Sequence, residues 1–101
     1  MKRIAFAIAL AALHVPVSAQ QSDPNYGRNL AAACAICHGT NGVNAGWLPN
    51  LAGQPSNYIA KQLRDFRDGK RPATIMHQIS KGYNEPQIDA LAAFFSAQKA
   101  K

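Results

Sequence analysis

The apolar residues of this chain recur at helical spacing in several short segments, which are separated by stretches rich in glycine, proline and asparagine. No segment shows the alternation of apolar and polar residues, with β-branched side chains, that marks a half-buried strand. We find no internal repeat and no low-complexity segment. The pattern predicts an all-α fold built from four or five short helices.

The first two helices are placed by their apolar spacing. The first is expected over about residues 25–34 and should stop near the stretch CAICH. The residues expected on its apolar face are Tyr26, Leu30 and Ala33. The second should begin at Pro55, which suits the first helical position, and should stop at Gly69. Its stripe at i, i+4 and i+7 comprises Ile59, Leu63 and Phe66.

Two further helices are expected toward the C-terminus. A short one covers Thr74 to Lys81 and ends at Gly82. The last opens with Asn84 as its cap and Gln87 three residues later, which is the spacing of a capping box. The residues of its expected buried stripe are Ile88, Leu91, Ala92 and Phe95. Between the first two helices, residues 39–54 show no periodicity, and a loop of that length in a small domain is usually functional.

The first 19 residues have the layout of a secretory signal peptide. Lys2 and Arg3 precede an apolar run over residues 4–17, and Val17-Ser18-Ala19 is a small-residue cleavage site. A transmembrane anchor is the alternative, but the run is short for a span and includes a histidine and a proline. We expect cleavage after Ala19 and export to the periplasm of residues 20–101, with no membrane span in the mature chain.

The exported chain would have 82 residues and form one domain, and a core of that size usually needs a disulfide, a metal or a large bound group. A Cys34–Cys37 bridge would close a loop too small to contribute much.

Loss of Lys2 and Arg3 lowers the formal net charge from +6 to +4, and the remaining basic residues gather between Lys61 and Lys81. We see no nucleic-acid-binding motif. An acidic protein surface is therefore the expected partner, with a solvated basic face as the alternative.

Both cysteines of the chain lie in the stretch CAICH, where His38 follows Cys37 directly. A redox disulfide normally sits on a βαβ framework, for which no strands are available here. A zinc site could use Cys34, Cys37, His38 and His77, but adjacent residues rarely ligate one tetrahedral ion together. The favoured interpretation is covalent attachment of haem c, for which C-x-x-C-H is the pattern. The two thiols would form the bonds to the porphyrin, and His38 would ligate the iron.

The iron of an electron-transfer haem needs a second axial ligand, and histidine with methionine is a usual pair. Met76 is the one methionine beyond the predicted signal peptide, so it is the favoured ligand. His77 next to it is the alternative and would lower the reduction potential.

Beyond the motif, residues 25–98 resemble a class I cytochrome c. The segments CHGTNG, LPNLAGQPSNYIAKQLRDFRDGKRPATIMHQISKGY and IDALAAFFSAQ are similar to haem domains of the cytochrome subunit of flavocytochrome c sulfide dehydrogenase and of related di-haem bacterial cytochromes. The resemblance implies that the Pro49 carbonyl accepts a hydrogen bond from Nδ1 of His38. It also implies that Gly27 meets Phe94 or Phe95 where the first and last helices cross. The single C-x-x-C-H predicts a mono-haem form.

With both axial positions filled, the expected function is one-electron transfer rather than enzymatic turnover. The resemblance implies a haem subunit that accepts electrons from a flavoprotein, the sulfide dehydrogenase. A free electron shuttle to a respiratory or photosynthetic chain is the alternative. A gas sensor in which Met76 detaches from the iron is a third class.

Overall fold

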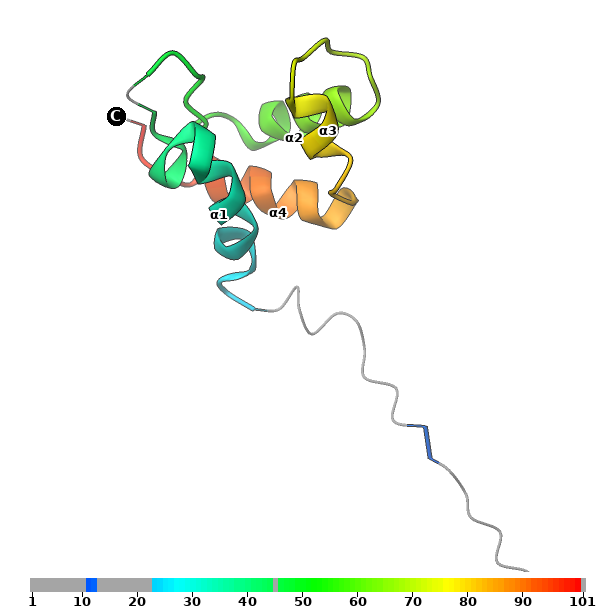
Figure 1. Ribbon diagram of the computed structural model, residues 1–101. Coiled ribbons are helices and arrows are strands. Elements are labelled where there is room, and N and C mark those ends of the chain that lie inside the picture. The colour runs from blue at the N-terminus through cyan, green and yellow to red at the C-terminus, as the bar shows by residue number, and fades with distance from the viewer. Residues whose placement is uncertain (1–10, 13–22, 45, 101) are drawn as a thin grey trace, which may run out of the picture.

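The computed structural model describes residues 11–12, 23–44 and 46–100, and these residues form helices and loops with no strand among them (Figure 1). The elements in order are α1 (Tyr26–His38), a 3-10 turn η2 (Thr40–Gly42), α2 (Ser56–Arg67), α3 (Met76–Ser80) and α4 (Glu85–Ser96). The prediction of an all-α fold is confirmed. No described helix has the length and apolar character needed to cross a membrane.

The predicted signal peptide, residues 1–19, lies outside the described residues except for positions 11 and 12. The signal peptide and the cleavage after Ala19 therefore stay predictions.

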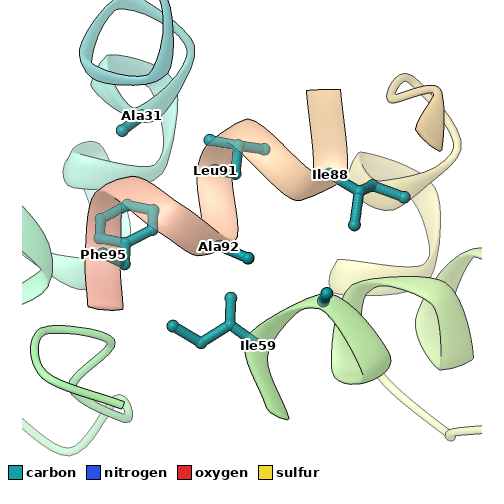
Figure 2. Packing of buried hydrophobic residues seen from close by; sticks show 7 residues of the cluster. Ala31, Ile59, Ile88, Leu91, Ala92 and Phe95 are labelled. Carbon is teal, nitrogen blue, oxygen red and sulfur yellow. The ribbon is translucent and has the colours of Figure 1, made fainter. Parts of the chain in front are cut away.

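Helix α4 is the centre of the core. Its capping box forms as the sequence predicts, because the Gln87 backbone N–H donates to the Asn84 side chain at 3.0 Å and the Asn84 N–H donates to the Gln87 side chain at 2.9 Å. All members of its predicted stripe are buried: Ile88, Leu91, Ala92 and Phe95. Figure 2 shows that this stripe packs against Ala31 of α1 and Ile59 of α2. The core is therefore built where three helices meet.

The crossing of α1 and α4 depends on Gly27. A Cβ atom at this position would lie 2.9 Å from the Ala90 carbonyl oxygen and 3.3 Å from Cβ of Phe94. The glycine thus lets the two helix backbones approach closely. The expected contact between Gly27 and the last helix is confirmed, with Phe94 as the aromatic at the crossing.

Helix α1 differs from the prediction in its end and in its buried face. It continues to His38 rather than stopping at about Cys34, because alanine favours the helix until Gly39, whose φ of 86° ends it. Ala31 is buried and Ala33 is exposed, so the predicted face was wrong at Ala33. Residues 30–37 of this helix are all apolar, so their spacing fits more than one face.

Helices α2 and α3 are shorter than expected. Pro55 caps α2 rather than opening it, and the predicted stop at Gly69 is confirmed by its φ of 75° just after the helix. Helix α3 begins at Met76 instead of Thr74, and Ile75 before it has a non-helical backbone. Thr74 and Ile75 are β-branched and lose side-chain freedom in a helix, which fits the later start.

Candidate functional site

The last turn of α1 carries the three residues of the C-x-x-C-H motif. Cys34 is half-buried and packs against the core, while Cys37 is exposed and His38 is half-buried. Residues three apart lie on the same side of a helix, so the two thiols project from neighbouring positions. Burial raises the pKa of the Cys34 thiol, and the charge of Cys37 raises it further. Cys34 is therefore a neutral thiol at pH 7, which is unlike the thiolate of a redox-active pair.

The chain after α1 folds back onto this last turn. Gly39 makes the reversal, and a Cβ atom there would lie only 1.8 Å from the Val43 carbonyl oxygen, so a residue with a side chain could not replace it without a shift of the backbone. The side-chain amide of Asn44 then donates to the Cys37 carbonyl at 3.0 Å. Further along, the Pro49 carbonyl oxygen lies 2.9 Å from Nδ1 of His38. These two contacts hold both ends of the segment between residues 44 and 49 against the helix end.

The contact with Pro49 fixes the proton on the His38 ring. A carbonyl oxygen can only accept, so Nδ1 must carry the hydrogen and donate it. In the neutral ring with the hydrogen on Nδ1, the other nitrogen, Nε2, has a lone pair that a metal can use. A hydrogen bond at the far nitrogen is how proteins orient a histidine that ligates a metal.

Met76 begins α3, and its thioether is half-buried. In Figure 1, α3 and the C-terminal end of α1 lie on the same side of α4. His77 follows Met76, and its Nδ1 atom is shielded from solvent with no hydrogen-bond partner in the described chain. The hydroxyl of the fully buried Ser80 also has none there. Such orphaned polar atoms usually mark a place where a bound group or water completes the structure.

The rival uses of the motif do not fit this geometry. Cys34 and Cys37 are both free thiols rather than a disulfide. Within the part of the chain that the structure describes, no three His, Cys, Asp or Glu residues come together as a metal site. The four ligands considered for zinc are all described residues, so they do not form that site.

Large apolar side chains are exposed in the motif, in the loop after it and beside Met76. Trp47 is 92% exposed and Ile36 is 85% exposed, and Ile75 next to Met76 in the sequence is 57% exposed. Large apolar groups left in water lower stability unless something covers them. Two free thiols, an oriented histidine and uncovered apolar side chains together fit a flat apolar group such as a porphyrin.

Sequence reasoning missed two contributors to the site. Asn44 fastens the loop to Cys37, and Tyr83 is half-buried beside Cys34, where burial and then the Cys34 charge raise the pKa of its phenol. The richness of residues 39–54 in asparagine and glycine predicted a functional loop. It could not identify which asparagine would reach the helix, because that pairing depends on the fold.

Half of the cations in the predicted basic cluster between Lys61 and Lys81 are paired with carboxylates of the same chain. Three of its cations form ion pairs, with N–O distances of 2.6–3.0 Å: Lys61, Arg64 and Arg67. Their partners are four carboxylates on α2, its C-cap and α4: Asp65, Asp68, Glu85 and Asp89. Lys70, Arg71 and Lys81 make no ion pair with other described residues. Instead, Arg71 donates to the Gln62 side chain and lies 4.6 Å from the Phe66 ring centroid.

Comparison with known proteins identifies the group to which these features belong. The family model described as cytochrome c matches residues 25–99. The match spans the described domain from the residue before α1 to beyond the end of α4.

Three relatives illustrate the range of sizes. The cytochrome subunit of sulfide dehydrogenase from Chlorobaculum tepidum is 38% identical over 69 residues, which cover 68% of this chain and 63% of the relative. The thiosulfate dehydrogenase electron acceptor of Stutzerimonas stutzeri is 40% identical over 109 residues, which cover 99% of this chain and 50% of the relative. Cytochrome c-554(548) of Halomonas halodenitrificans is 33% identical over 81 residues, covering 76% of this chain and 98% of the relative. The chain spans about half the length of the larger relatives.

Proposed function

This chain belongs to the cytochrome c family, and we propose that it transfers one electron at a time on a single covalent haem c ligated by His38 and Met76. Cytochromes c are electron carriers, and haem c is their covalently attached cofactor. The assignment of individual residues is our proposal. The observation that carries it is the 2.9 Å contact between Nδ1 of His38 and the Pro49 carbonyl, which leaves Nε2 for the iron.

Each residue has a distinct task in this proposal. Cys34 and Cys37 would hold the porphyrin through thioether bonds, since both lie on one side of the last turn of α1. Pro49 keeps the His38 ring in one tautomer and one orientation. Met76 would offer its thioether sulfur as the second ligand of the iron. The haem would supply the reversible one-electron redox change, and with both residues as ligands the iron would offer no open position to a substrate.

The N-terminal segment supports a periplasmic location for this activity. The signal-peptide layout of residues 1–19 predicts export, and we propose that residues 20–101 act as a mono-haem domain after cleavage at Ala19. The intact mass of the exported protein tests the cleavage, with allowance for cyclisation of an N-terminal Gln20. A mass that does not match a chain beginning at Gln20 would contradict it.

An optical spectrum tests the haem assignment. The full chain would be expressed in a host that attaches haem c, and its colour would be measured before and after acid–acetone extraction. We expect the colour to stay with the protein and the oxidised form to show the weak band at the near-infrared edge that reports methionine ligation. Colour that extracts completely would contradict covalent attachment at Cys34 and Cys37.

Two neighbouring substitutions separate the candidate axial ligands. Met76→Ala should abolish the near-infrared band, and the ferrous protein should then bind carbon monoxide. His77→Ala is the matched control, and it should keep the band because His77 is not the ligand. Absence of the band from the unaltered protein, with carbon monoxide binding gained in His77→Ala and not in Met76→Ala, would assign the second ligand to His77. Carbon monoxide binding by the unaltered ferrous protein would favour the gas-sensor class instead.

The relatives favour a second, narrower function. Two of them are named for dehydrogenases of sulfide and of thiosulfate. We propose that this chain accepts electrons from a dehydrogenase of reduced sulfur compounds, and that a sulfide dehydrogenase partner would be a flavoprotein. Reduction of the ferric protein by sulfide should then require a purified flavoprotein sulfide dehydrogenase subunit. Reduction at the same rate without that subunit would favour the free shuttle.

A further inference from the structure

Two asparagines join the two ends of the loop that follows α1. The backbone N–H of Asn44 donates to Oδ1 of Asn50 at 2.5 Å. The Asn44 side chain uses both of its polar atoms, since Nδ2 donates to the Cys37 carbonyl at 3.0 Å and Oδ1 accepts from the Gly46 N–H at 2.7 Å. We term Asn44 and Asn50 the asparagine clamp.

The asparagine clamp completes a closed ring of bonds. From the Cys37 carbonyl, the ring passes through the side chain and N–H of Asn44 to Oδ1 of Asn50. From there it follows the peptide bond back to Pro49, whose carbonyl oxygen lies 2.9 Å from Nδ1 of His38. His38 follows Cys37 directly in the chain, which closes the ring. The clamp therefore limits how far the Pro49 carbonyl can move from the histidine.

Burial does not hold the Pro49 carbonyl in place. Pro49 and Asn50 are both exposed, so water can compete for each of their polar groups. A single hydrogen bond between exposed groups contributes little, because water can replace it. The base of the loop is fixed by the Gly42 carbonyl, which accepts from the Leu51 N–H at 2.8 Å. The asparagine clamp adds a second connection, which lies closer to Pro49 in the chain.

The position of this carbonyl matters for a histidine that ligates iron. A carbonyl that accepts from the Nδ1–H of His38 makes Nε2 a stronger electron donor. A stronger donor favours ferric over ferrous iron, and hydrogen bonding around the ligands is one means by which a protein sets a reduction potential. If the Pro49 carbonyl moves away, the Nδ1–H is left to water and the donor weakens.

We propose that Asn44 and Asn50 are positioning residues for His38, which act through the Pro49 carbonyl and thereby lower the reduction potential of the bound haem. The inference rests on the proposed ligation of iron by His38. It adds two residues that lie outside the C-x-x-C-H motif and that need no contact with the cofactor, because they act on the carbonyl and on the Cys37 backbone.

Removal of the acceptor on Asn50 provides the first test. In haem-loaded Asn50→Ala, the Nδ1–H of His38 should exchange with solvent about two- to ten-fold faster, as expected for the loss of one net hydrogen bond. NMR of the ferrous protein measures the exchange. The reduction potential, measured by spectroscopic titration, should rise because the ligand donates less. Asn29→Ala is the matched control, since it truncates an exposed asparagine on α1, and it should change neither value.

Aspartate at the two positions provides a sharper contrast. Asn50 accepts through Oδ1, so Asn50→Asp keeps the acceptor and should retain the slow exchange of the His38 Nδ1–H. Asn44 donates through Nδ2, which aspartate lacks, so Asn44→Asp would set a carboxylate against the Cys37 carbonyl and should exchange faster. Both variants add one negative charge to the same loop, so the added charge is matched. This contrast decides the question if Asn50→Ala does not fold or does not bind haem.

Three results would overturn the inference. The first is an unchanged exchange rate or an unchanged potential in Asn50→Ala, and the second is equal exchange in the two aspartate variants. The third is a lower free energy of unfolding with neither spectroscopic change, which would give the clamp a purely structural role. Failure of the proposed function would appear separately, as unaltered protein with no covalent haem, and it would remove this inference with it.

Discussion

The side of the domain formed by α2 and α4 is complete by itself, whereas the end of α1, residues 43–44 and 46–50, and α3 are not. The first has a capped helix, a fully buried stripe and a network of ion pairs. The second leaves Trp47, Ile36 and Ile75 in water and leaves His77 Nδ1 without a partner in the described residues. The contrast indicates that the chain alone specifies the first side, and that the second takes its final form only around a bound group.

The largest effect should come from removing the covalent attachment. In the double variant Cys34→Ala, Cys37→Ala, we expect no haem after acid–acetone extraction and loss of cooperative thermal unfolding. A group that binds only the folded state stabilises it, and the incomplete side would lose that contribution. Circular dichroism against temperature measures this. A cooperative transition with an unchanged midpoint would show that α1, α2 and α4 form a sufficient core without the cofactor.

The side formed by α2 and α4 should instead lose stability when a residue of its own core is truncated. Phe95→Ala removes a ring that is 2% exposed where α4 meets α1 and α2, and such truncations cost about 3–5 kcal/mol of unfolding free energy. Urea unfolding of the haem-loaded protein measures it. Phe94→Ala is the control and should cost less, because Phe94 is only half-buried. Equal losses in the two variants would contradict the assignment of Phe95 to the centre of the core.

The same division explains which features the sequence could predict. The stripe and capping box of α4 could be predicted residue by residue, because local spacing and a local hydrogen-bond pattern determine them. The resemblance of the motif and its flanking segments also predicted the cytochrome c family, and the family model confirms it. The buried face of α1 was wrong at Ala33, since residues 30–37 are all apolar and show no single periodic stripe.

Long-range pairings were beyond the reach of local patterns. Nothing in the sequence specifies that Asn44 bonds to the Cys37 carbonyl, or that Arg64 reaches Glu85 and Asp89 on α4. The basic cluster therefore looked like a free surface, although half of it is paired. The proximity of Pro49 to His38 came from the resemblance and not from spacing.

The free energy of unfolding should fall when a single methyl group is added where α1 crosses α4. Gly27→Ala would place a Cβ 2.9 Å from the Ala90 carbonyl oxygen, and backbone there cannot move freely. Overpacking of this kind costs about 1–3 kcal/mol, which urea unfolding can resolve. Gly82→Ala is the matched control, because its nearest atom would lie at an ordinary 3.4 Å. A neutral Gly27→Ala would mean that α1 can shift away from α4, and the two sides would then be less rigidly joined.

The smallest effect should come from the ion pairs on the complete side. Hydrogen bonds from Arg64 and then Arg67 lower the pKa of Glu85. A depressed carboxyl pKa contributes stability above the ordinary glutamate value of about 4.3, and this contribution is lost as pH falls through the lower folded value. Glu85→Gln should therefore be slightly less stable than the unaltered protein at neutral pH, and the difference should vanish in acid. The exposure of the pair keeps the effect small, and salt should reduce it further. Urea unfolding at several pH values measures the difference, and a loss that persists in acid would mean that Glu85 acts through packing rather than charge.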